Sequence, residues 1–173
     1  MSTLKISGTV SDSIVDGPGL RYTVFTQGCP HHCEGCHNPG THDFNGGKDI
    51  DTQEILKQIF ANPLLDGVTF SGGEPFCQPL PLCEIAKEIK AKGLNVVTYT
   101  GYTFEELLAL KRDGVKELLK LSDVLIDGRF VLKRRKLALY MRGSENQRII
   151  NVSRSLAEGK AIEYTLNEYG ELV

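Results

Sequence analysis

Three cysteines in a short run of the sequence are able to hold one metal centre. Cys29, Cys33 and Cys36 lie in Gly-Cys-Pro-His-His-Cys-Glu-Gly-Cys, with the spacing C-x3-C-x2-C. Cysteine thiolates suit iron–sulfur clusters. Three thiolates leave one iron of a 4Fe–4S cluster without a protein ligand. The spacing therefore predicts an open iron, at which a second molecule can bind and react.

A zinc site of the Cys3His type is the alternative for the same residues. His31 and His32 lie inside the loop and could supply a fourth ligand, whereas His37 follows Cys36 directly and is poorly placed for the same ion. His42 lies outside this group, and we expect it at the surface. Spacing alone leaves the cluster and the zinc site both open.

A second candidate segment, Ser71-Gly72-Gly73-Glu74-Pro75, follows a short predicted strand over residues 67–70. Two glycines allow the backbone to approach a ligand closely, and Glu74 offers a carboxylate to an ammonium group. Glycine pairs are also common in ordinary turns. The position of the pair at the end of a strand favours a binding loop.

These segments resemble the radical S-adenosylmethionine (SAM) superfamily. Asp16-Gly17-Pro18-Gly19-Leu20-Arg21, ahead of the cysteines, is similar to the corresponding segment of glycyl-radical-enzyme activases. Residues 99–102, 124–130 and 142–148 are most similar to the branch that activates an anaerobic ribonucleoside-triphosphate reductase. The resemblance extends from about Asp16 to Arg148.

The resemblance implies a ligand set. The cluster would be bound by Cys29, Cys33 and Cys36, and SAM would chelate its open iron. The residues implied in SAM binding are Gly35, Cys36 and His37, near the adenine or ribose, and Gly72, Gly73 and Glu74, near the amino group. No side chain is implied as a general acid or base.

The resemblance also implies a reaction and its partners. An external one-electron donor such as flavodoxin would reduce the cluster, and SAM would be cleaved to methionine and a 5′-deoxyadenosyl radical. That radical would take a hydrogen atom from a glycine in the large chain of the reductase. Asp16, Gly17 and Arg21 would contact the glycine-bearing peptide, although a plain turn also explains Asp16–Gly19. Asp127-Gly128-Arg129 fits either a core salt bridge or a contact to the methionyl carboxylate.

Three other functions remain as alternatives. One is activation of another glycyl radical enzyme, such as pyruvate formate-lyase, whose activases are generally longer. Another is a radical SAM enzyme acting on a small molecule, which would need a closed pocket. The third is a zinc-binding module without enzymatic activity.

Composition restricts the class of protein. The chain has 173 residues, 40% of them hydrophobic, and a formal net charge of −2. That length predicts a single radical SAM domain over residues 1–173, and the charge does not favour a nucleic-acid partner. The N-terminus lacks an apolar signal region, so we expect a cytoplasmic protein without a membrane partner. Cys77 and Cys83 are expected to pack as small hydrophobic residues.

The elements that would position these residues alternate between strands and helices. Apolar patterns predict strands over residues 20–27, 67–70, 94–100 and 123–126, and helices over 52–60, about 82–89, 103–112 and 115–121. Such alternation favours a parallel sheet with candidate sites at the carboxyl ends of its strands. A closed (β/α)8 barrel needs about 250 residues. We therefore expect an open partial (β/α) barrel, as the resemblance to radical SAM proteins also implies.

Overall fold

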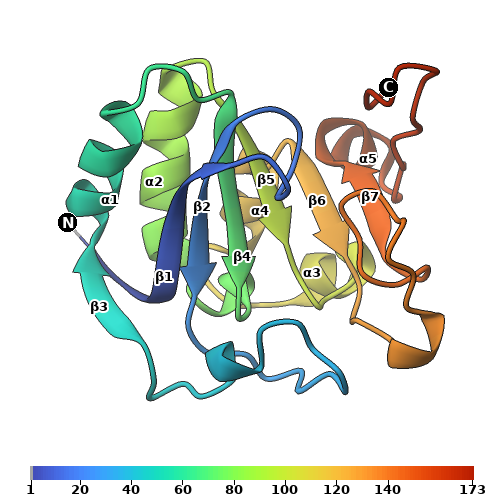
Figure 1. Cartoon of the computed structure of the whole chain (residues 1–173), viewed down its shortest axis with the longest axis horizontal. Helices are drawn as coiled ribbons and strands as arrows, with labels where there is room; N and C mark the ends of the chain where they lie inside the picture. Colours follow the sequence, from blue (N-terminus) through green and yellow to red (C-terminus); the bar gives the residue numbers. More distant parts are fainter. Residues whose placement is uncertain (1) are drawn as a thin grey trace.

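The computed structural model describes residues 2–173, which form one seven-stranded sheet packed against helices (Figure 1). The strands are β1 (Thr3–Ser13), β2 (Arg21–Thr26), β3 (Lys48–Asp51), β4 (Gly67–Gly72), β5 (Asn95–Tyr99), β6 (Val124–Asp127) and β7 (Arg148–Asn151). The α-helices are α1 (Thr52–Phe60), α2 (Pro79–Ala91), α3 (Phe104–Ala109), α4 (Val115–Leu121) and α5 (Val152–Glu158).

The centre of the sheet is parallel and its edges are antiparallel. The strand order is β3-β1-β2-β4-β5-β6-β7, with β2, β4, β5 and β6 parallel to one another. The strands β1, β3 and β7 pair in the antiparallel sense. Because β3 and β7 remain as free edges, the sheet is not closed. The open α/β architecture predicted from the sequence is confirmed, while the three antiparallel strands were not predicted.

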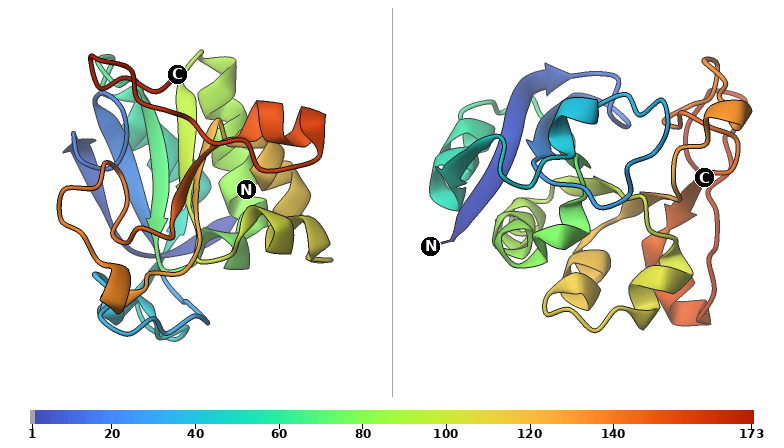
Figure 2. Two further views of the ribbon diagram at one scale, coloured as in Figure 1. Left: turned by 90° about the vertical axis from the view of Figure 1, so that its right-hand side faces the viewer. Right: turned by 90° about the horizontal axis from the view of Figure 1, so that it is seen from below.

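The helices cover one face of the sheet (Figure 2). α1 packs beside α2, α2 beside α4, and α4 beside both α3 and α5. The apolar stripes of these helices are buried against the strands: Ile55 on α1 and Ile85 on α2 are completely inaccessible, as are Val68 and Phe70 on β4. This layer holds the parallel strands in register, so that their carboxyl ends form one row.

The opposite face carries a smaller apolar cluster and the ligand-sized cavity. Val97 and Ile126 point away from the helices and pack with Met141 and Ile149. The long loop that follows β2, coloured blue to cyan, runs beneath the arrowheads of β2 and β4 (Figure 1). The two loops predicted to carry chemistry thus leave the sheet at the same edge.

Local signals account for the helix ends. Asp51 caps α1 by accepting a hydrogen bond from the amide of Gln53, as its position before the helix predicts. Thr103 caps α3 through the amide of Glu106 at 3.1 Å. The carboxylate of Glu106 binds Arg129.

In the described part of the chain, no helix has both the length and the apolar character needed to cross a membrane.

Candidate functional site

One cavity of about 780 Å³ joins the two predicted loops. Its wall includes all three cysteines of the loop after β2 and Ser71, Gly72 and Gly73 at the end of β4. Since β2 and β4 are adjacent parallel strands, their carboxyl ends bring these loops side by side. The volume falls in the range of about 300–1,000 Å³ that is usual for cofactor and small-molecule sites.

The cysteine loop is closed by its own backbone. The amide of Gly28 donates to the carbonyl of Thr41 at 2.7 Å, and that of Cys29 to the carbonyl of His42 at 3.2 Å. The amide of Asn38 lies 3.4 Å from Cys36 Sγ and donates to it. Hydrogen bonds of this kind tune the potential of a cluster bound through the sulfur.

The cysteines differ in accessibility. Cys29 is buried, whereas Cys33 and Cys36 are half-buried and face the cavity. Burial raises the pKa of the Cys29 thiol to about 11. Glu74 and Cys33 add to this increase, and hydrogen bonds from the backbone of the loop reduce it. The free thiol therefore keeps its proton at neutral pH, and metal binding displaces it.

The donor set fits a cluster better than a single zinc ion. Among residues 2–173, no three His, Cys, Asp or Glu side chains converge closely enough to hold one ion. A 4Fe–4S cluster is larger and takes thiolates spaced around its corners. Of the two histidines considered as a fourth zinc ligand, His31 is already engaged, because its Nε2 contacts Glu74 at 2.7 Å.

The two glycines allow the loops to pack against each other. Gly72 has φ +93°, and a Cβ at Gly73 would lie 2.4 Å from the carbonyl oxygen of Gly28. The amides of Gly73 and Glu74 donate to the carbonyls of Thr26 and Gly28, both at 2.8 Å. The sequence suggested that these glycines admit a ligand. In the structure they also admit the backbone of the cysteine loop.

Glu74 has a different environment from the one predicted. Its side chain is completely buried, and it is absent from the cavity wall among the described residues. Its two oxygens accept hydrogen bonds from four groups, which are the amides of Phe76 and Gly101, the hydroxyl of Thr100 and the ring of His31. A carboxylate has about four acceptor sites, so none is left for an ammonium group.

The residues predicted to meet a peptide separate into two groups. Asp16 lines the cavity, and its carboxylate accepts from the hydroxyls of Ser13 and Thr23. Gly17 is buried with φ +144°.

The prediction that Arg21 contacts the peptide is wrong, because its side chain is completely buried. Its guanidinium donates to Thr69 and to the carbonyls of Pro18, Val68 and Asn95. Burial lowers the pKa of this guanidinium to about 10. Arg21 therefore supports the loop from inside and does not reach a partner.

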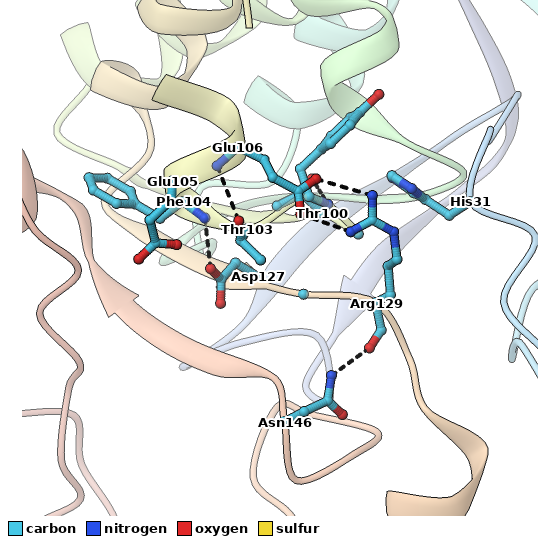
Figure 3. Close-up of polar contacts among 12 residues, drawn as sticks. His31, Thr100, Thr103, Phe104, Glu105, Glu106, Asp127, Arg129 and Asn146 are labelled. Carbon is cyan, nitrogen blue, oxygen red and sulfur yellow. Dashed lines mark hydrogen bonds and ion pairs between the residues drawn. The ribbon is translucent and has the colours of Figure 1, made fainter. Parts of the chain in front are cut away.

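Asp127 and Arg129 form supporting contacts around α3 (Figure 3). Asp127 accepts from the amide of Phe104 at 2.8 Å and pairs with Arg148. Arg129 makes two hydrogen bonds to Glu106, at 2.9 and 3.1 Å. The sequence left two alternatives for Asp127-Gly128-Arg129, a salt bridge or a contact to the methionyl carboxylate. The structure contains the salt bridge.

Several cavity residues were not assigned from the sequence. Thr100 and Gly101 come from the end of β5, and Phe130, Met141, Arg142, Gly143 and Gln147 from the segment between β6 and β7. His37 lines the cavity, and its ring packs against that of Phe130 at a tilt of 48°, with centroids 5.0 Å apart. Gly35 is exposed, and a Cβ there would lie 2.8 Å from Leu132 Cδ1.

The surface position predicted for His42 is wrong. This residue is half-buried in the cavity wall, and its buried Nε2 has no hydrogen-bond partner among the described residues.

Comparison with known proteins agrees with this site. The family described as "4Fe-4S single cluster domain" matches residues 15–150. The anaerobic ribonucleoside-triphosphate reductase-activating proteins of Salmonella typhi and Escherichia coli K12 are 38% and 37% identical over 144 residues, which cover 78% of this chain and 90% of theirs.

Another relative and one solved structure overlap a smaller share. The pyruvate formate-lyase-activating enzyme of Clostridium pasteurianum is 42% identical over 113 residues, which are 60% of this chain. The match spans about half of that enzyme's length (48%). The crystal structure of QueE from Escherichia coli overlaps 58% of this chain and 54% of its own, with a TM-score of 0.45 and 17% identity, and is too distant to bear on function. By the family match and by the relatives aligned over nine-tenths of their length, this chain belongs to the family of anaerobic ribonucleoside-triphosphate reductase-activating proteins.

Proposed function

We propose that this protein activates an anaerobic ribonucleoside-triphosphate reductase by generating its glycyl radical. The observation that carries the proposal is the shared cavity, in which three cysteines and the Gly72-Gly73 loop face the same space. A cluster held by three thiolates and a second ligand placed beside it both fit there. The family assignment supplies the class of protein substrate.

The residues of the chain bind and orient the two cofactors. Cys29, Cys33 and Cys36 would hold the 4Fe–4S cluster, and the backbone of Gly72, Gly73 and Gly101 would face the methionyl end of SAM. Bound together, the cofactors supply reductive cleavage of SAM to methionine and a 5′-deoxyadenosyl radical. No acid–base side chain is needed for that chemistry.

The rest of the cavity separates a reactive species from water. Phe25, Tyr99, Phe130 and Met141 give part of the wall an aromatic or apolar character. His37 lies on the cluster side of this wall, where we propose that it contacts the nucleoside. A one-electron donor, such as a flavodoxin, would deliver the electron from outside, since Cys33 and Cys36 are only half-buried.

The test is anaerobic incubation of the reconstituted protein with SAM and dithionite, with and without the candidate reductase. We expect slow formation of 5′-deoxyadenosine by the protein alone. With the reductase, a doublet in the electron paramagnetic resonance (EPR) spectrum should appear on the partner. Absence of the doublet, with the cluster intact and SAM bound, would contradict the proposal.

A second candidate is activation of a pyruvate formate-lyase, favoured by the 42% identity to an enzyme of that name. The same incubation with pyruvate formate-lyase distinguishes the two partners. A doublet found there and never on the reductase would leave the reaction unchanged and replace the partner.

A further inference from the structure

Glu74 lies where three loops meet, and its carboxylate has four hydrogen-bond partners. One of its oxygens accepts from Thr100 Oγ1 at 2.8 Å and from the amide of Phe76 at 3.1 Å. The other accepts from the amide of Gly101 at 2.8 Å and contacts His31 Nε2 at 2.7 Å. Glu74 therefore connects the end of β4 to the end of β5 and to the cysteine loop.

His31 brings the cysteine loop to this carboxylate. It lies between Cys29 and Cys33, and only 5% of its side chain is exposed. Its ring meets Tyr102 edge-on, with centroids 4.6 Å apart, and lies against Gly101, where a Cβ would come within 2.4 Å of His31 Cδ2. Figure 3 shows His31 and Thr100 in this region. Since a carboxylate only accepts hydrogen bonds, Nε2 carries the proton.

We propose that the buried His31–Glu74 pair is a positioning contact that holds the cluster loop against the SAM-binding ends of β4 and β5. Glu74 then acts on the cluster loop and not on the ammonium group of SAM. This inference rests on the proposed function, because it presumes that Cys29, Cys33 and Cys36 bind the cluster.

Two physical arguments support this assignment over direct SAM binding. All acceptor sites of the carboxylate are in use, so an ammonium group would have to displace a donor already bound. The displaced donor would be left buried without a hydrogen-bond partner, which is unfavourable. Three of the four partners of Glu74, which are His31, Thr100 and Gly101, line the cavity, so loss of the contacts would free the loops of its wall.

The test uses His31→Ala, His31→Gln, Glu74→Gln and the double variant His31→Ala/Glu74→Gln. Each reconstituted protein is challenged anaerobically with an iron chelator, and iron release is timed. Substituting groups just outside a metal's ligands typically weakens metal binding by about 10–100-fold. We therefore expect faster release by about that factor in His31→Ala and Glu74→Gln. The effect of the double variant should be smaller than the two single effects combined, because both changes remove the His31–Glu74 contact.

Two variants separate positioning from a general loss of folding. His31→Gln keeps a side-chain donor and should restore slow iron release, with the melting temperature of the apoprotein unchanged. His32→Asn changes the exposed neighbour, which has φ +47°, to a residue that tolerates this conformation, and should release iron normally. If Glu74→Gln does not fold, the comparison of His31→Ala with His31→Gln still tests whether a side-chain donor at this position slows iron release.

The opposite pattern would overturn the inference. If Glu74→Gln weakened SAM binding, measured by titration calorimetry, while iron release in both single variants stayed normal, Glu74 would be the ligand of the SAM amino group. Additive effects in the double variant would also refute a shared contact. Failure of the glycyl-radical assay is a separate result, because iron release requires no reductase.

Discussion

Cys29, Cys33 and Cys36 differ from Cys77 and Cys83 in where their sulfur atoms lie. The first three line the cavity, whereas Cys83 lies on α2, is 2% exposed in the apolar core and faces the carbonyl of Gly114. Cys77 is half-buried and does not line that cavity. The interpretation of Cys83 as a small hydrophobic residue is confirmed by its burial.

Replacing a cavity cysteine should remove the cluster. We expect Cys33→Ala to contain little iron after anaerobic reconstitution and to lack the brown iron–sulfur absorbance. The control Cys77→Ala should retain both. Cys83→Ala should also retain both while losing about 1 kcal/mol of unfolding free energy, the usual size of a core change. Full iron content in Cys33→Ala would exclude it as a ligand.

Gly73 provides a second test at the residue level. A methyl group there would meet the Gly28 carbonyl at 2.4 Å, directly before the first cysteine. Gly73→Ala should therefore lose iron as well as SAM affinity, which a purely ligand-facing glycine would not do.

Gly40 is the matched control for Gly73. It lies in the same region, and a Cβ there has no neighbour within 4 Å among the described residues. Gly40→Ala should bind iron and SAM normally. Normal iron content in Gly73→Ala, measured beside this control, would show that the loop tolerates the contact.

At the level of elements, apolar periodicity predicted the parallel strands and the helices between them. It did not predict β1, β3, β7 or α5. Three residues of β1 are buried, which are Leu4, Ile6 and Ser13, and most of the others are exposed, so no clear alternation appears in its sequence. Strands β3 (Lys-Asp-Ile-Asp) and β7 (Arg-Ile-Ile-Asn) contain one and two apolar residues, whereas the equally short β6 has three in a row. β1 and β7 form on the unpaired backbone groups of β2 and β6, and β3 then forms on those of β1.

The candidate site shows the same division between local and tertiary signals. The three cysteines are close to one another in sequence, and so are the two glycines. Their spacing alone indicates two candidate binding loops. The sequence shows the Glu74 carboxylate, but three of its four donors, in His31, Thr100 and Gly101, come from loops that only the folded sheet brings together. Met141 and Arg142 reach the cavity from a segment with no periodicity. The position of such residues depends on tertiary packing, which sequence spacing does not encode.

Two arginines form ion pairs next to helix α3, one with a buried carboxylate and one with an exposed carboxylate. Replacing each arginine by alanine compares the two ion pairs. Arg148 pairs with Asp127, which is 1% exposed, while Arg129 pairs with Glu106 at 45% and 40% side-chain exposure. Arg148→Ala leaves a buried carboxylate without its cation and should cost about 3–5 kcal/mol of unfolding free energy. Arg129→Ala breaks an exposed pair and should cost about 0–1 kcal/mol.

Urea unfolding of the two apoproteins measures this difference. Wild type and both variants should be compared in one buffer, since salt weakens the exposed pair more than the buried one. Equal losses in the two variants would show that the Asp127 carboxylate is stabilised by its contact to the amide of Phe104 alone.

At the scale of the whole molecule, the sheet is open and one side of the cavity is bordered by the loop between β1 and β2. Ile14 and Val15 line the cavity and are 76% and 77% exposed. Large apolar side chains left in water beside a reactive site are typical of a surface that binds another protein. We therefore expect the glycine-bearing loop of the partner to enter the cavity from this side.

The last prediction follows from this exposed pair. Ile14→Ser/Val15→Ser should weaken binding of the reductase by about tenfold or more, since removing two apolar contacts at an interface costs about 1–2 kcal/mol. Iron content and the slow cleavage of SAM without the partner should stay at wild-type levels, because neither side chain holds a cofactor. The EPR doublet, titrated against reductase concentration, measures the change. Leu80→Ser is the control, because Leu80 is 54% exposed at the start of α2, on the helix-covered face of the sheet, and does not line the cavity. Equal titration curves for the double variant and the control would place the partner on another face of the protein.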